Sequence, residues 1–265
     1  MKKIKTILIT GAGTGIGKDS ALELALRGHS IIATTETNEQ AREMQEASVE
    51  TGLSIESFKL DITNKNDREK ITNYNIDVLI NNAAIGESGS LAEINIDKVR
   101  NNFEVNVFSS LELTQLALKK MLKKDKGTIV FISSLAGRTV MPFLGSYTMT
   151  KFSLSAGSEA LRKELKRITK NVHITVVEPG AYHTGFNQIM LAKKYKWMNK
   201  NSYFYKIIYK LKIGEKMYFK IMEKKSTKSI VNKIIKASES KRPSLRYSAP
   251  WWQDLGVKIQ RVFGK

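Results

Sequence analysis

A tyrosine and a lysine stand four residues apart in the segment 146–151, Ser-Tyr-Thr-Met-Thr-Lys. The apolar periodicity that follows predicts a helix from Tyr147 to about Arg167, and a spacing of four places both side chains on one face, one turn apart. An ammonium beside a phenol favours the phenolate and so lowers the pKa of the tyrosine. Tyr147 is therefore a candidate proton donor and acceptor near neutral pH, with Lys151 as its partner. The alternative is a surface tyrosine beside a solvated lysine.

A glycine-rich segment near the start of the chain lies between an apolar run and a helical pattern. Residues 5–10 predict a buried strand, residues 18–27 predict a helix, and residues 10–17 read Thr-Gly-Ala-Gly-Thr-Gly-Ile-Gly. Glycines let the backbone approach a pyrophosphate, and the N-terminus of the following helix offers free N–H groups and a positive dipole. The order of strand, glycine loop and helix therefore predicts a nucleotide site, whereas a glycine loop alone is also compatible with a tight turn.

Strand and helix patterns alternate along the chain, which predicts an α/β fold with a Rossmann-like, doubly wound parallel sheet. Further strands are expected at 30–34, 54–60, 76–80, 127–134 and 172–177, and further helices at 38–51, 64–73 and 97–123. The expected strands end at or just before Gly11, Asp61, Asn82, Ser134 and Pro179. Because the carboxyl ends of parallel strands meet at one edge of the sheet, we expect these residues to surround a single site.

The helix expected at 97–123 carries Phe103, Val107, Leu111 and Leu118 on the face predicted to point inward. Asn106 lies at the edge of this apolar stripe. It is a candidate site residue, and the alternative is a polar residue near solvent.

The pattern changes after residue 185. Residues 186–222 contain nine aromatic residues and nine lysines but one acid, which favours either a helical lid over a substrate or a solvated helical appendage. Amphipathic helices are expected at 227–237 and 251–263, and an edge strand at 244–247. We therefore expect one domain, 1–265, with a cofactor-binding and catalytic core (1–185), a lid (186–222) and a C-terminal part (223–265).

Composition limits the possible compartments and partners. The chain has no cysteine, no run of eighteen apolar residues, and an N-terminal apolar run too short for the core of a signal peptide, so we expect a cytoplasmic protein, possibly peripheral to a membrane. The net charge is +19, and residues 186–265 hold 20 of the 44 basic residues but only 4 of the 25 acidic ones. This asymmetry indicates an anionic lipid, nucleic acid or acidic substrate as a partner, or else a general bias toward lysine.

Six motifs in this order resemble those of the short-chain dehydrogenase/reductase family, across at least residues 4–184. They are Thr-Gly-x-x-x-Gly-Ile-Gly at 10–17, Asp61, Asn-Asn-Ala at 81–83, Asn106, Ser134 with Tyr147-x-x-x-Lys151, and Pro-Gly-x-x-x-Thr at 179–184. Ser134 precedes Tyr147 by thirteen residues, the usual spacing in the family. Ala84 is a departure, because the family usually has glycine there, and its methyl group is expected to narrow the floor of the cofactor site.

The resemblance implies hydride transfer between a nicotinamide cofactor and a secondary alcohol or ketone, with Tyr147 as the acid/base. It implies that Lys151 lowers the pKa of Tyr147 and holds the nicotinamide ribose, that Ser134 binds the reacting oxygen, and that Asn106 positions a water. The catalytic residues would be Asn106, Ser134, Tyr147 and Lys151. The cofactor-binding residues would be Gly11, Thr14, Gly15, Ile16, Gly17, Thr35, Glu36, Asp61, Ile62, Asn82, Ala83, Ala84, Tyr147, Lys151, Pro179, Gly180 and Thr184. No metal site is expected.

The cofactor is expected to be NAD(H) rather than NADP(H), because Glu36 would repel a 2′-phosphate and neither position 14 nor position 36 is basic. Two observations argue against this. Thr35 occupies the place where NAD-preferring members usually carry their acid. Lys18 and Arg42 could also reach toward a 2′-phosphate. The substrate is expected to be apolar, either lipid-, steroid- or retinoid-like or acyl, and the resemblance suggests a homodimer or homotetramer.

Two other functions remain open at this stage. One is a catalytically idle nucleotide-binding or scaffold protein, against which the complete Asn106, Ser134, Tyr147 and Lys151 set argues. The other is a peripheral membrane reductase, or a nucleic-acid binder, that uses the basic C-terminal third. We expect weak association with an anionic membrane surface and no specific nucleic acid.

Overall fold

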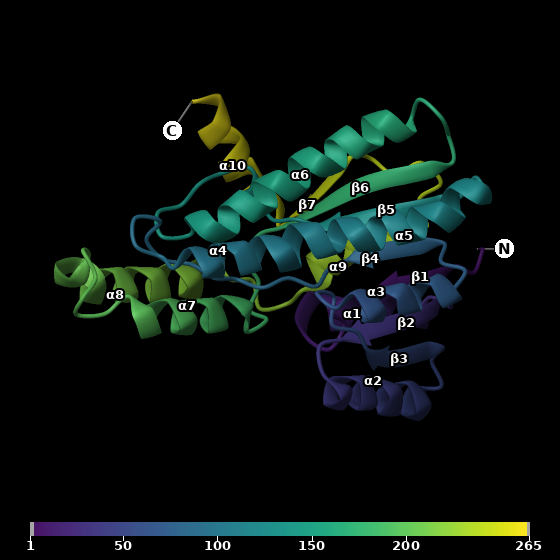
Figure 1. The fold of residues 1–265 in the computed structure, drawn as a ribbon, viewed down its shortest axis with the longest axis horizontal. Coiled ribbons are helices and arrows are strands. Elements are labelled where there is room, and N and C mark those ends of the chain that lie inside the picture. Colours follow the sequence, from purple (N-terminus) through teal and green to yellow (C-terminus); the bar gives the residue numbers. More distant parts are fainter. Residues whose placement is uncertain (1–2, 264–265) are drawn as a thin grey trace.

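Seven parallel strands form the centre of the protein in a computed structural model, which describes residues 3–263 (Figure 1). They pair in the order β3-β2-β1-β4-β5-β6-β7, and the order reverses between β1 and β4. In open sheets of this kind the ligand lies at the carboxyl ends of the strands, beside this reversal. The strands are β1 (Thr6–Ile9), β2 (Ser30–Thr35), β3 (Ile55–Lys59), β4 (Val78–Asn81), β5 (Gly127–Ile132), β6 (Val172–Pro179) and β7 (Arg246–Ala249). The Rossmann-like fold predicted from the sequence is confirmed.

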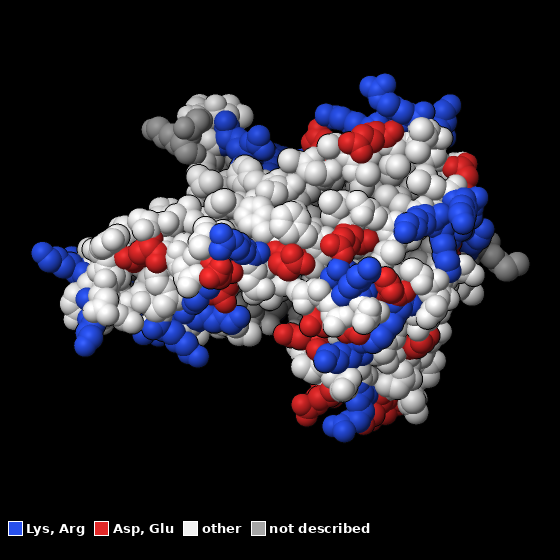
Figure 2. All heavy atoms as spheres, viewed as in Figure 1, with Lys and Arg blue, Asp and Glu red and all other residues white. Residues whose placement is uncertain are grey.

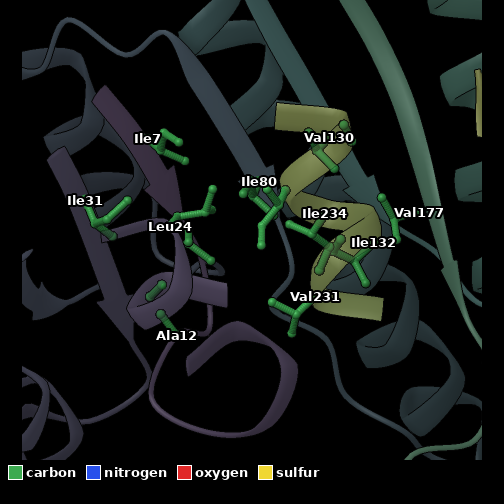
Figure 3. Close-up of a cluster of buried hydrophobic side chains, with 14 of the residues drawn as sticks. Ile7, Ala12, Leu24, Ile31, Ile80, Val130, Ile132, Val177, Val231 and Ile234 are labelled. Atoms are coloured by element: carbon green, nitrogen blue, oxygen red, sulfur yellow. The ribbon is translucent and has the colours of Figure 1, made fainter. Parts of the chain in front are cut away.

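Helices cover both faces of the sheet because the side chains of each strand alternate between two apolar clusters. Ile7 and Ile9 of β1 belong to the cluster beneath α1 (Gly15–Leu26), α2 (Asn38–Thr51) and α9 (Lys228–Glu239), part of which Figure 3 shows. Leu8, between them, belongs to the cluster beneath α5 (Ser109–Lys123) and α6 (Gly145–Leu165). Both clusters are buried, so the strands are apolar on both faces, as in other sheets covered by helices on both sides.

The long helix predicted at 97–123 is interrupted. It consists of α4 (Ile96–Phe103), a π-helical turn η2 (Glu104–Phe108) and α5. The wider turn shifts the phase of the helix that follows, so Leu111, predicted to point inward, is 42% exposed. The same turn carries Asn106 to a position where it is 1% exposed, so the alternative of a polar residue near solvent is wrong.

Other boundaries differ by a few residues. Helix α1 begins at Gly15, three residues before the predicted start, and the edge strand β7 begins two residues later than predicted. The segment expected to be helical at 64–73 forms a short helix, α3 (Lys65–Glu69), followed by a 3₁₀ turn, η1 (Lys70–Asn73).

The segment 186–222 forms two helices, α7 (Phe186–Trp197) and α8 (Tyr205–Met222), which project from one end of the molecule in Figure 1. Its single acid, Glu215, accepts hydrogen bonds from Lys194 Nζ and Tyr195 Oη, each at 2.5 Å, and so joins α8 to α7. Lys194 is 3% exposed, and burial lowers its pKa although the contact with Glu215 opposes this. The last helix, α10 (Trp251–Val262), is separated from β7 by a single residue, Pro250.

Candidate active site

The loop between β1 and α1 requires glycine at particular positions. Gly11 has a φ of +64°, a conformation in which a residue with a Cβ is strained. A Cβ at Gly17 would lie 2.3 Å from the Gly11 carbonyl oxygen and 2.5 Å from Asn82 Nδ2. Thr14 is the N-cap residue of α1, but its side chain makes no capping hydrogen bond. The N–H groups of the first turn therefore remain available to an anion. The loop therefore fits the pyrophosphate of a dinucleotide.

Asn82 and Thr10 lock this loop to the end of β4. Asn82 Nδ2 donates to the carbonyl oxygens of Thr10 and Gly11, at 2.9 and 3.0 Å. In return, Thr10 Oγ1 accepts from the N–H groups of Asn82 and Ala83, at 3.0 and 3.1 Å. The residues of two separate motifs thus form one rigid floor, and Ala84 lines the cavity above it.

The ends of β2 and β3 supply the part of the cavity where we expected the adenosine. Thr35, Glu36, Asp61 and Ile62 all line it. Asp61 Oδ1 accepts from the N–H and the hydroxyl of Thr63, which holds its carboxylate in place. Glu36 is exposed to solvent at this edge.

Tyr147 and Lys151 lie on α6, with Ser134 facing them from the end of β5. Ser134 caps a short turn, η3 (Leu135–Gly137), by accepting from the Ala136 N–H at 3.0 Å. Lys151 Nζ donates to the Ile132 carbonyl oxygen at 2.9 Å and lies 5.6 Å from the centre of the Tyr147 ring. Both α6 side chains are buried, which excludes the alternative of a surface tyrosine and a solvated lysine.

Burial governs the acidity of this pair. It raises the pKa of Tyr147, while a hydrogen bond with Ser134 acts in the opposite direction. It also lowers the pKa of Lys151 to about 8. The low pKa predicted for Tyr147 is therefore wrong for this arrangement, because removal from water disfavours the phenolate more than the hydrogen bond with Ser134 favours it. Both residues are held closer to their neutral forms than they would be in water.

Both ends of the Asn106 side-chain amide are engaged in hydrogen bonds with neighbouring residues. Its Oδ1 accepts from the Ile85 N–H at 2.9 Å, and its Nδ2 donates to the Ile85 carbonyl oxygen and to Thr150 Oγ1, each at 3.0 Å. Asn106 thereby ties the π-helical turn to the segment after β4 and to the helix of Tyr147. It does not line the cavity, unlike every other predicted site residue.

The end of β6 closes the cavity with Pro179, Gly180 and Thr184. Gln253 of α10 holds this segment: its Oε1 accepts from the Ala181 N–H and its Nε2 donates to the Met222 carbonyl oxygen, each at 2.8 Å. A Cβ at Gly180 would lie 1.9 Å from Gln253 Oε1. Gln253 was not predicted, and no local pattern could have found it, since its partner Ala181 lies 72 residues earlier.

One cavity of about 730 Å³ joins all these parts. Beyond Tyr147 its walls are mostly apolar, with Phe186 packed 5.6 Å from the Tyr147 ring, centre to centre. The apolar side chains at this end are Leu135, Met141, Leu144, Phe186, Ile189, Met190, Tyr218, Phe219, Met222 and Val257. Among the described residues that line the cavity, the only lysines or arginines are Lys151 and Lys193, and Lys193 Nζ lies 3.4 Å from Glu87 Oε1.

Comparison with known proteins agrees with this geometry. The family model described as short chain dehydrogenase matches residues 5–194. The chain belongs to the short-chain dehydrogenase/reductase family. It is 31% identical over 263 residues to a probable short-chain type dehydrogenase/reductase, VdlC, of Helicobacter pylori, which covers 96% of this chain and 89% of that protein. It is 32% identical over 178 residues to a diacetyl reductase of Staphylococcus epidermidis, covering 64% of this chain and 69% of the relative.

A solved family member has the same fold. A short-chain dehydrogenase/reductase from Burkholderia phymatum, crystallised in complex with NAD, superposes with a TM-score of 0.83 over 98% of this chain and 94% of that one, at 18% identity. As a member of this family, the protein is an oxidoreductase with a Rossmann-type nucleotide-binding fold. No helix within residues 3–263 is long and apolar enough to cross a bilayer.

Proposed function

We propose that the protein interconverts a secondary alcohol and a ketone with a nicotinamide cofactor, at a site built for an apolar substrate. The observation that carries this proposal is the single cavity, which has a glycine cradle at one end, apolar walls at the other and Ser134, Tyr147 and Lys151 between them. The diacetyl reductase among its relatives is named for the reduction of a ketone, which supports the reaction class.

In the proposed reaction the Tyr147 hydroxyl donates its proton to the carbonyl oxygen during reduction and takes it back during oxidation. Ser134 Oγ binds the same oxygen, so that two donors meet the negative charge that develops there. The bound nicotinamide would supply or accept the hydride. Lys151 would hold the ribose beside Tyr147, and its Nζ is already fixed on the Ile132 carbonyl oxygen.

The role of Asn106 follows from its contacts. Because its amide binds Ile85 and Thr150 at three points, we infer that it fixes the position of α6 relative to the segment after β4. The positioning of a water by Asn106 stays a prediction.

We further propose NAD(H) as the preferred cofactor. Glu36 lines the adenosine end of the cavity, and no lysine or arginine among the described lining residues lies at that end. Arg42 is one of the two basic residues that the sequence offered for contact with a 2′-phosphate. Its Nε lies 3.7 Å from Glu46 Oε1, and it does not line the cavity. Lys18 does not line it either.

We also propose that the protein assembles as a homodimer or homotetramer, in the cytoplasm. Exposed apolar side chains on η2, α5 and α6 support an interface there, namely Phe108, Leu111, Met149 and Phe152. The molecular mass in solution, measured by light scattering, tests this part of the proposal.

A panel of ketones and alcohols of increasing chain length, followed at 340 nm with each cofactor, tests the activity. We expect kcat/KM to rise with the apolar length of the substrate and to be higher with NADH than with NADPH. Tyr147→Phe is the control for activity at this site, since it removes only one hydroxyl. The proposal would be contradicted if the protein turned over none of these compounds, or if Tyr147→Phe turned them over as fast as the wild type. Either result would favour a catalytically idle nucleotide-binding protein.

A further inference from the structure

Helix α10 exposes its apolar side and buries its polar side. The residues that face the body of the protein are Gln253, Asp254 and Val257. The residues on the opposite side form an apolar stripe that is open to solvent: Trp251, Trp252, Leu255, Ile259 and Val262, of which Trp251 is 74% exposed. A surface helix normally packs its apolar stripe on the core. The sequence predicted this amphipathic helix correctly, but each side chain of the stripe is between 41% and 79% exposed.

Helix α8 has a second exposed apolar stripe. Tyr205, Tyr209, Ile213, Met217 and Ile221 follow one another at intervals of four, and all are exposed. Residues four apart lie on one side of a helix, so these side chains form a continuous row. No residue of α8 is buried.

The exposed charged side chains of α8 itself all have one sign. Its five lysines, Lys206, Lys210, Lys212, Lys216 and Lys220, are all exposed. The only acid of the helix, Glu215, is turned toward α7 and bound by Lys194 and Tyr195. The outer side of α8 therefore presents tyrosines and aliphatic side chains among cations, and Figure 2 shows the lysines along this projecting end. Tyrosine rings and lysine stems suit the boundary between headgroups and acyl chains.

The two helices that carry the stripes also contribute other residues to the wall of the same cavity. Gln253 near the start of α10 donates to the carbonyl oxygen of Met222, the last residue of α8. Tyr218, Phe219 and Met222 of α8 line the cavity, and so does Val257 of α10. Figure 1 shows α7 and α8 projecting at one end of the molecule, with α10 standing apart from them at the top.

We propose that α8 and α10 dock the protein on an anionic phospholipid surface through their exposed apolar stripes. A second copy of the chain is a poorer occupant, because two α8 helices would bring ten lysines together with no exposed acid on either helix. An anionic bilayer satisfies both the apolar stripes and the charge.

Sedimentation of the full chain with phospholipid vesicles tests the docking. We expect the wild type to partition at least tenfold more strongly onto vesicles of equal parts phosphatidylglycerol and phosphatidylcholine than onto phosphatidylcholine alone, and to be released by salt. Emission from Trp251 and Trp252 should shift to the blue on binding. Equal partition onto both kinds of vesicle, or onto neither, would overturn the proposal.

Paired variants separate the two stripes from general basicity. Lys210→Glu with Lys216→Glu on α8, and Trp251→Ser with Leu255→Ser on α10, should each reduce binding to anionic vesicles roughly tenfold or more. Lys166→Glu with Lys170→Glu makes the same change in charge in the loop between α6 and β6, at the far ends of the strands, and should leave most of the binding intact. Thermal unfolding of each variant checks that the fold is kept. Equal loss in the control pair would mean that net charge alone drives binding.

Two further outcomes have defined meanings. If the α10 variant lowers the molecular mass in solution while the wild type does not bind vesicles, the stripe joins two copies of the chain and the proposal is wrong. Tyr147→Phe should bind vesicles like the wild type, since docking needs no turnover. A failure of docking is thereby distinguished from a failure of the proposed reaction.

Discussion

Replacement of Lys151 by methionine should change how the stability of the fold depends on pH. Burial lowers the pKa of Lys151 from 10.5 to about 8. Below both values the lysine is charged in the folded and the unfolded protein, and the folded state bears a cost of about 3 kcal/mol, since one pKa unit corresponds to about 1.4 kcal/mol. The cost falls as the pH rises from 8 toward 10.5 and vanishes above that range, where both states are neutral. From this residue alone, the wild type should gain about 2 kcal/mol of stability between about pH 7 and about pH 9.5.

Urea denaturation of the protein with no nucleotide added, at these two pH values, measures the effect. Lys151→Met lacks the gain, so its stability relative to the wild type should fall by about 2 kcal/mol on going to the higher pH. The variant lacks the bond from Lys151 Nζ to the Ile132 carbonyl oxygen at both pH values, and the weakening of that bond when the wild-type lysine loses its proton is already contained in the pKa shift. Lys166→Met, which removes an exposed lysine, is the control. The reasoning fails if the free energies of unfolding of the wild type and Lys151→Met differ by the same amount at both pH values. Burial of the charged Lys151 would then not destabilise the folded protein.

Four further predictions follow from the site and the lid. Tyr147→Phe should lower kcat about 10²–10⁴-fold with little change in the affinity for the cofactor measured by fluorescence titration, and retention of more than about a tenth of kcat would remove Tyr147 from the acid/base role. The wild type should have the higher kcat/KM with NADH, and Glu36→Arg should move the preference toward NADPH; a tenfold wild-type preference for NADPH, about 1.4 kcal/mol, would refute the assignment. Gln253→Leu leaves a buried N–H and a carbonyl oxygen without their partners, at about 1 kcal/mol each, and should raise the KM for the cofactor roughly tenfold while kcat changes less. Glu215→Gln leaves the buried lysine of α7 without its carboxylate, so amide hydrogen exchange should speed up across 186–222 but not in the sheet, and uniform exchange in both would contradict the predicted lid.

The sequence predicted those parts of the molecule that depend on local pattern. The sheet, the glycine cradle and the Tyr147–Lys151 pair each follow from spacing within a few residues, and parallel strands then bring their ends together. The interrupted helix was not predictable in this way. The apolar spacing in the sequence continues without a break, whereas the π-helical turn changes the direction in which the side chains after it point. Leu111 was therefore placed inside, which is wrong, and the burial of Asn106 could not be read from the pattern.

Two other features depend on burial and on distant partners. The pKa of Tyr147 depends on how completely α6 and α7 exclude water from it, which a spacing of four residues does not express. The Gln253 contacts join segments far apart in the chain. The stripe of α10 was recognised as apolar, but an amphipathic pattern says only that two sides differ, and not which side faces the protein.

The two hydrogen bonds of Gln253 would make two distant binding events, docking on lipid and binding of the nucleotide, thermodynamically dependent on one another. This side chain belongs to α10, and it holds both the end of α8 and the segment that follows Pro179. If docking on lipid stabilises this arrangement of α10 and the nucleotide also favours it, each must increase the affinity for the other by the same factor. The protein would then bind its nucleotide more tightly when docked than when free in solution. Gln253→Leu would separate the two equilibria while leaving each ligand its own site, so that lipid no longer changes the affinity for the nucleotide.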